Sequence, residues 1–96
     1  MHVISKKKLR LFRSIHPEAK NSLNHWFRAA KKADWTMFAD LQATFPSADQ
    51  VGKYTVFDIG SNKYRLIAEI NYNRGKVFTR HVFTHAQYSR GTWKKT

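Results

Sequence analysis

The chain has 96 residues, 42% of them hydrophobic and 15% aromatic, which is enough for one domain with a core and excludes global disorder. Eighteen lysines and arginines against six acidic residues give a net charge of +12, which favours a polyanionic partner, either nucleic acid or an acidic protein. The absence of cysteine excludes disulfides and thiolate metal sites and fits a cytoplasmic location. No apolar run reaches the ~18 residues of a membrane span, so no membrane partner is expected.

The N-terminal residues predict a short strand followed by a basic helix. Residues 1–5 read as the strand, and Ser5 is placed to cap a helix that begins at Lys6. Leu9 and Phe12 form its inward stripe. A solvated face and an RNA-backbone track are both open interpretations of the basic residues that face outward, which are Lys6, Lys7, Lys8, Arg10 and Arg13.

Two further helices are predicted before the chain turns to strands. Pro17 suits a first helical position, and apolar residues then recur at helical spacing at Ala19, Leu23, Trp26, Phe27 and Ala30. Asp34 or Thr36 is expected to cap a third, short helix that ends at Phe45-Pro46. Residues 47–53 read as a loop.

The C-terminal half predicts three antiparallel strands over residues 54–59, 63–72 and 76–84, with a turn at residues 60–62. Alternation in the middle strand makes one sheet face apolar and leaves charge on the other. A two-residue loop at Arg74-Gly75 puts Arg80 on the face of Arg65, whereas a three-residue loop from Asn73 puts it on the helix-covered face. We expect the two arginines to lie together, by loop length or by a bulge.

These elements predict one domain, residues 1–96, of the α+β class. An N-terminal strand and two to three helices would pack on one face of a small, mainly antiparallel sheet of about four strands, in two layers. Residues 90–96 are expected to form a flexible basic tail, apart from a docked Trp93.

A set of residues suited to chemistry on a phosphodiester follows the last strand. Thr84 and Gln87 fit a capping box, which predicts a helical turn beginning at His85. A spacing of three puts His85 and Tyr88 side by side, so a titratable imidazole and a phenol lie near the strand arginines Arg65 and Arg80.

Two-metal nuclease chemistry is not expected, because it needs clustered carboxylates. After Asp49 the only acidic residues are Asp58 and Glu69, and His2, His16 and His81 show no ligand spacing. His81 is interpreted as a partly buried polar residue. Neither a metal ion nor a cofactor is predicted.

Four stretches of the chain carry a resemblance to a known family. They resemble the HigB family of type II toxins, which is similar in fold to the RelE/ParE superfamily, and the similarity runs from Met1 to Tyr88. The Asn-x-x-Arg and Thr-His-x-x-Tyr pieces, in this order and spacing, carry most of it. The matching stretches are residues 45–47, 56–60, 62–68 and 84–88.

The resemblance implies a ribosome-dependent, metal-independent endoribonuclease that cleaves mRNA during translation. It also implies a cognate helix-turn-helix antitoxin that neutralises the toxin in a hetero-oligomer. By position it assigns Arg65, Arg80, His85 and Tyr88 to the catalytic site and Lys63 to a basic position beside it. Two residues depart from the family pattern: Ser61 replaces a frequent glycine, and Ser89 replaces a frequent acidic residue after the tyrosine.

Two alternative functions are compatible with the residues themselves. One is a toxin of the same fold that acts on a target other than RNA, such as gyrase. The other is a basic nucleic-acid-binding module without catalysis. A pure binding module needs no titratable pair such as His85 and Tyr88, and a gyrase-directed relative needs no arginines to hold a phosphate, so these residues favour the endoribonuclease.

Overall fold

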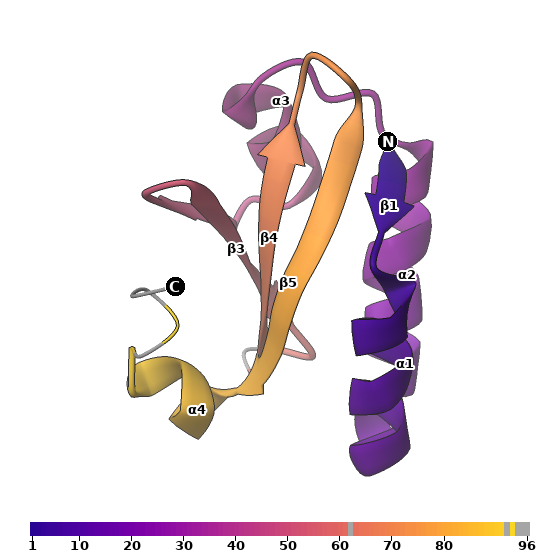
Figure 1. Ribbon diagram of the computed structural model, residues 1–96, viewed down its shortest axis with the longest axis vertical. Coiled ribbons are helices and arrows are strands. Elements are labelled where there is room, and N and C mark those ends of the chain that lie inside the picture. Colours follow the sequence, from indigo (N-terminus) through magenta and orange to yellow (C-terminus); the bar gives the residue numbers. More distant parts are fainter. Residues whose placement is uncertain (62, 92, 94–96) are drawn as a thin grey trace.

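The structure, a computed structural model, describes residues 1–61, 63–91 and 93, and it confirms the α+β class. Figure 1 shows the helices gathered beside and behind a twisted sheet. The elements in chain order are β1 (His2–Ile4), α1 (Lys6–Ile15), the 3₁₀ turn η1 (Pro17–Ala19), α2 (Lys20–Lys32), α3 (Phe38–Thr44), β2 (Asp49–Val51), β3 (Tyr54–Ile59), β4 (Tyr64–Asn71), β5 (Lys76–Thr84) and α4 (His85–Ser89).

In the described part of the chain the sheet has five strands in the order β1-β5-β4-β3-β2, one more than the approximate number predicted. The additional strand is β2, which lies within the predicted loop and pairs antiparallel with β3. Val51 pairs with Tyr54 across a two-residue turn, and Gly52 has a positive φ of 59° there. Such a turn suits a tight hairpin, because glycine adopts this backbone region without strain. Among these strands β1 pairs parallel with β5, and the other neighbours are antiparallel.

One face of the sheet is covered by α1, α2 and α3, and the main core lies between them. Trp26 of α2 packs edge-on against Phe57 of β3, with ring centroids 5.3 Å apart. Leu41 of α3 and Leu66 of β4 have no exposed surface. Of the predicted apolar stripe, Leu23, Trp26 and Ala30 of α2 are buried and Phe27 is half-buried. Ala19 is also buried but lies in η1, so the turn that begins at Pro17 is 3₁₀ and α2 begins only at Lys20.

The opposite face of the sheet also carries apolar side chains, although the alternation of the middle strand predicted a charged face there. A second small cluster lies there, made of Tyr54, Val56, Ile67 and Trp93. Trp93 is only 3% exposed, so its predicted docking is confirmed. The rest of the predicted tail includes residues 92 and 94–96, which lie outside the described residues.

Two predicted helix caps differ in detail from the structure. Ser5 precedes α1 but adopts a left-handed conformation with φ of 70°, and its side chain makes no cap hydrogen bond. The N-cap of α3 is Met37 rather than Asp34 or Thr36. Thr36 nevertheless holds this helix start, because its backbone N–H and its hydroxyl donate to Asp40 Oδ2 over 2.9 and 2.6 Å.

The β4–β5 hairpin brings Arg65 and Arg80 to the same face of the sheet. Asn71 pairs with Lys76, so the loop has four residues and neither of the two lengths considered. An even loop length still preserves the predicted parity. A bulge follows between Ile67 and Ala68 of β4, and beyond it Ile67 pairs with His81 and Arg65 with Phe83. Arg80 and His81 therefore both lie on the face of Arg65.

Candidate active site

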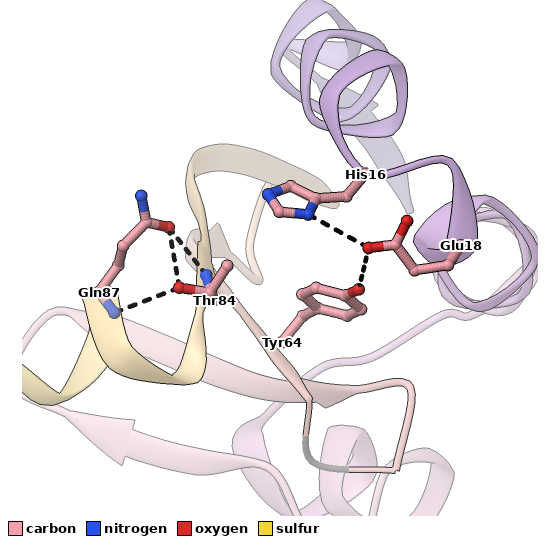
Figure 2. Close-up of polar contacts among 5 residues, drawn as sticks. All are labelled: His16, Glu18, Tyr64, Thr84 and Gln87. Carbon is pink, nitrogen blue, oxygen red and sulfur yellow. Dashed lines mark hydrogen bonds and ion pairs between the residues drawn. The ribbon is translucent and has the colours of Figure 1, made fainter.

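Helix α4 begins where β5 ends, as predicted, and a capping box fixes its start (Figure 2). The Thr84 backbone N–H donates to Gln87 Oε1 over 2.9 Å, and the Gln87 N–H donates back to Thr84 Oγ1 over 3.3 Å. The His85 backbone N–H donates to the Lys63 carbonyl over 3.1 Å, which ties α4 to the start of β4. The start of α4 is therefore hydrogen-bonded both to the end of β5 and to the residue that precedes β4.

His85 is the exposed member of the predicted pair. Its ring Nδ1 lies 3.4 Å from the hydroxyl of Ser89, one turn later, and that hydroxyl donates to the His85 carbonyl over 2.9 Å. Ser89 thus contacts the imidazole directly from the last residue of α4. The imidazole is open to solvent and to a ligand that reaches α4.

Tyr88 is half-buried and held by aromatic contacts. Its ring stacks on Trp93 at a centroid distance of 5.3 Å and an interplanar angle of 23°. Trp93 Nε1 donates to the Tyr88 carbonyl over 3.2 Å, and the Trp93 ring packs edge-on against Tyr54. Trp93 therefore connects Tyr88 of α4 to Tyr54 of the sheet. The spacing of His85 and Tyr88 in the sequence gives no indication of this contact.

Arg65 lies directly beside Tyr88, with its guanidinium carbon 5.3 Å from the centre of the tyrosine ring. This contact has the geometry of a cation–π pair. Arg65 is only 9% exposed, and its Nε lies 3.1 Å from Asp58 Oδ1 on the neighbouring strand. Arg65 therefore lies on the sheet face that was predicted to carry charge, but it is buried there, with Tyr88 packed against its guanidinium.

Arg80 lies at the bulge and has a different acidic partner. Its Nε donates to Glu69 Oε1 over 3.1 Å, and Glu69 also lies 4.0 Å from Lys53 Nζ. Arg80 precedes Phe83, the partner of Arg65, by three positions, which corresponds to about 10 Å along the strand. Arg65 and Arg80 lie on the same face of the sheet, but Arg65 pairs with Asp58 whereas Arg80 pairs with Glu69.

His81 joins this face although no sequence pattern selected it for the site. Its ring stacks on Phe83 with centroids 5.0 Å apart and an interplanar angle of 14°. Partial burial, together with the charges of Lys8 and Arg80, lowers the pKa of His81, so its neutral form is favoured. Strict alternation separates it from Arg80, and only the bulge, which no local sequence signal marks, brings them to one face.

The basic residues of α1 do not form one continuous track. Lys6 Nζ lies 5.3 Å from the centre of the Phe27 ring of α2, and Arg10 lines the same groove between the two helices. Lys8 points the other way, because its Nζ donates to the Arg80 carbonyl. Lys7 is exposed between them. Lys63 is exposed at the turn before β4, next in space to the start of α4.

A polar contact on the helix-covered face connects the site strands to the helices (Figure 2). The Tyr64 hydroxyl, from the residue that pairs with Thr84, donates to Glu18 Oε1 over 2.7 Å. His16 Nδ1 lies 3.2 Å from the same oxygen. The Tyr64 hydrogen bond lowers the pKa of Glu18, and the carboxylate in turn raises the pKa of Tyr64.

A mixed sheet with helices on one face and a short helix after its last long strand defines a small RelE-like α+β protein. The chain belongs to the HigB toxin family, described as the RelE-like toxic component of a toxin–antitoxin system, and the family model matches residues 19–91. No helix among the described residues is long and apolar enough to cross a membrane.

Three relatives show how much of the chain this similarity covers. The mRNA interferase HigB of Escherichia coli O6:H1 is 30% identical over 95 residues, which is 96% of this chain and 92% of that protein. The mRNA interferase toxin HigB of E. coli K12 is 31% identical over 91 residues, 92% of this chain and 88% of that protein. The mRNA interferase HigB of Shigella flexneri shows the same identity and coverage.

Proposed function

We propose that this protein is an endoribonuclease toxin that cleaves mRNA on the ribosome without a metal ion. It acts in the cytoplasm and is neutralised by a cognate antitoxin of the helix-turn-helix type. Membership of the HigB family and the names of its relatives support this proposal. The observation that carries it is the contact between the guanidinium of Arg65 and the ring of Tyr88 in α4, the helix whose first residue is the exposed His85.

RNA cleavage of this kind needs proton transfer and a cation. The 2′-oxygen of a ribose attacks the adjacent phosphorus while the bond from phosphorus to the 5′-oxygen of the next nucleotide breaks. One group takes the proton of the 2′-hydroxyl, another gives a proton to the leaving 5′-oxygen, and a cation stabilises the extra negative charge on the phosphorane.

His85 is the principal proton-transfer group in this proposal, because an imidazole can both accept and donate a proton and the His85 ring is accessible. Tyr88 takes the second position beside it, with its ring fixed by Trp93 and Arg65. Arg65 supplies the charge for the phosphorane, since a guanidinium matches the geometry of phosphate oxygens. Asp58 orients Arg65 through the 3.1 Å ion pair.

The remaining basic residues are assigned to phosphates farther along the message. Arg80 lies about 10 Å from Arg65 along the strand, so it suits a neighbouring phosphate rather than the one that is cut. Lys63 lies next to α4, and Lys6, Lys7, Lys8 and Arg10 extend the positive surface over α1. Such contacts supply affinity without sequence preference.

A reconstituted translation reaction with purified ribosomes and a defined mRNA tests the proposal. Primer extension should map cuts within the translated region for the parent protein and none for His85→Ala. The same mRNA without ribosomes should remain uncut. Intact mRNA with the parent on translating ribosomes would overturn the proposal, and loss of DNA supercoiling by gyrase in the same preparation would assign the protein to the other class of toxin.

A further inference from the structure

A groove of about 350 Å³ lies between α1 and the second half of β5. Its lining includes Lys8 and Arg80, assigned above to phosphates farther along the message, but not His85, Tyr88 or Arg65. Figure 1 shows α1 running alongside this part of β5, with α4 at the end of the strand. Leu11 and Ile15 of α1 line one side of the groove, and Val82 and Phe83 of β5 line the other. Gln87 of α4 also lines it, so the groove reaches the helix that carries His85.

The apolar lining of this groove is unusually open to solvent. Leu11 is 54% exposed and Ile15 is 73% exposed; among the described residues the only other large exposed hydrophobic side chain is Met37. Their spacing of four puts Leu11 and Ile15 on one face of α1. Exposed aliphatic side chains that adjoin half-buried ones mark protein contact sites, whereas they give a nucleic acid neither charge nor a stacking surface.

The groove also runs beside a sheet edge without a strand partner. β1 pairs with β5 only from Lys76 to Phe78, and among the described residues no strand continues along β5 beyond that point. Lys8 Nζ of α1 donates to the carbonyl of Arg80 on this edge. An edge of this kind accepts an added strand from another chain, with the backbone supplying affinity and the neighbouring side chains supplying specificity.

The charges around the groove indicate what kind of partner it can bind. Its lining carries the cations of Lys8 and Arg80 beside the imidazoles of His16 and His81, and none of the described residues that line it is acidic. The whole chain carries a net charge of +12. A second copy of this chain would therefore meet like charge, whereas an acidic segment would meet complementary charge.

We infer that this groove is the docking surface for an extended acidic segment of the antitoxin, which adds to the edge of β5 and packs apolar side chains on Leu11 and Ile15. This inference rests on the proposed function for the existence of the antitoxin. Because Gln87 lines the same groove, the bound segment lies beside α4 and obstructs the approach of mRNA to His85. Neutralisation then needs no direct contact with the catalytic side chains.

The test measures the affinity of the toxin for the protein encoded by the adjacent reading frame, by calorimetric titration of separately purified components. The double variant Leu11→Glu/Ile15→Glu should bind this antitoxin at least 100-fold more weakly than the parent. Met37→Glu, at the other exposed hydrophobic residue, is the matched control and should bind within threefold of the parent. All three proteins should cleave mRNA on ribosomes at the same rate. Hydrogen exchange should show antitoxin-dependent protection of the backbone amides of residues 79–84.

Four results would overturn the inference. The double variant could bind the antitoxin as tightly as the parent, or it could bind normally and lose mRNA cleavage, which would make the groove an RNA surface. The parent could sediment as a dimer that the double variant abolishes, which would assign the groove to a second copy. It could also cleave mRNA without binding the antitoxin at all. A parent that binds through the groove but leaves mRNA intact would instead refute the proposed activity and support the docking surface.

Discussion

The guanidinium of Arg65 lies 3.1 Å from the carboxylate of Asp58 and 5.3 Å from the centre of the Tyr88 ring. One side chain thus joins the β3–β4 pair to the helix that carries His85. Because Arg65 is buried, its role in stability and its proposed role in catalysis are coupled, and a substitution must be measured for both.

Arg65→Ala should lower both the stability and the activity of the protein. Removing one partner of a mostly buried ion pair leaves the other charge unsatisfied, so we expect a loss of about 2 kcal/mol in the free energy of unfolding. Loss of a preorganised cation should slow mRNA cleavage by about 10²–10³-fold. Chemical denaturation and single-turnover cleavage measure the two effects. Arg65→Lys should restore more stability than activity, because lysine keeps the charge but loses the two-pronged geometry.

The matched control is Asp58→Asn, which removes the negative partner and keeps Arg65. It should be destabilised to a similar degree, yet it should cleave mRNA within about tenfold of the parent. If Asp58→Asn loses as much cleavage as Arg65→Ala, the arginine acts through the fold alone and the phosphate role is wrong.

His85→Ala should abolish toxicity while the fold stays intact. Loss of a general acid or base slows a reaction by about 10²–10⁴-fold. The side chain is exposed, so the melting temperature should change by less than about 2 °C. His25→Ala removes another histidine, on α2, and should remain as toxic as the parent. Equal mRNA cleavage by the two variants would remove His85 from the mechanism.

Trp93→Ala should impair cleavage although Trp93 touches no substrate in the proposed mechanism. Truncating a buried tryptophan costs about 3–5 kcal/mol, and here it also frees the ring of Tyr88. Trp93→Phe keeps an aromatic surface for Tyr88 and should recover most of kcat, whereas Trp93→Leu should recover stability more than kcat. Equal kcat for these two variants would limit Trp93 to a packing role.

Tyr64→Phe should make the protein less stable at neutral pH but not in acid. The Tyr64 hydrogen bond holds the pKa of Glu18 below its ordinary value of 4.5. A carboxyl group with a lowered pKa in the folded state contributes stability above its unfolded pKa, and that contribution is lost as the pH falls through the folded value. The melting temperatures of parent and variant should therefore differ at pH 7 and converge as the pH falls through the lowered pKa of Glu18. In a Glu18→Gln background, the effect of Tyr64→Phe on the melting temperature should no longer depend on pH in this range.

The salt dependence of RNA binding should identify the surface that follows the message. For a single strand, the slope of log affinity against log salt is about −0.7 per phosphate contacted. Lys7→Glu/Arg10→Glu should reduce the magnitude of this slope by about 1 to 1.5, as expected for the loss of two phosphate contacts. Lys31→Glu/Lys32→Glu makes the same charge change at the exposed end of α2 and should affect the slope less. Equal slopes for the two double variants would indicate that α1 is a solvated face and not an RNA track.

Local pattern determined most of the secondary structure. The 3.6-residue spacing of Leu23, Trp26 and Ala30 predicted α2, and the capping box of Thr84 and Gln87 predicted the start of α4. Both signals work because backbone hydrogen bonds and the burial of one face are satisfied within a few residues. The short β2 was missed because a three-residue strand buries little by itself and is stabilised by its partner β3.

The sequence alone determined that this is a basic α+β protein with His85 and Tyr88 one helical turn apart and with arginines on the preceding hairpin. Only the tertiary structure decided what surrounds them. The bulge near Ile67 turned His81 to the face of Arg65. Trp93 stacks on Tyr88, and the Tyr88 ring lies against the guanidinium of Arg65, which pairs with Asp58. These contacts join residues far apart in the chain, and their free energy comes from desolvation and from packing between separate elements, which no local sequence pattern encodes.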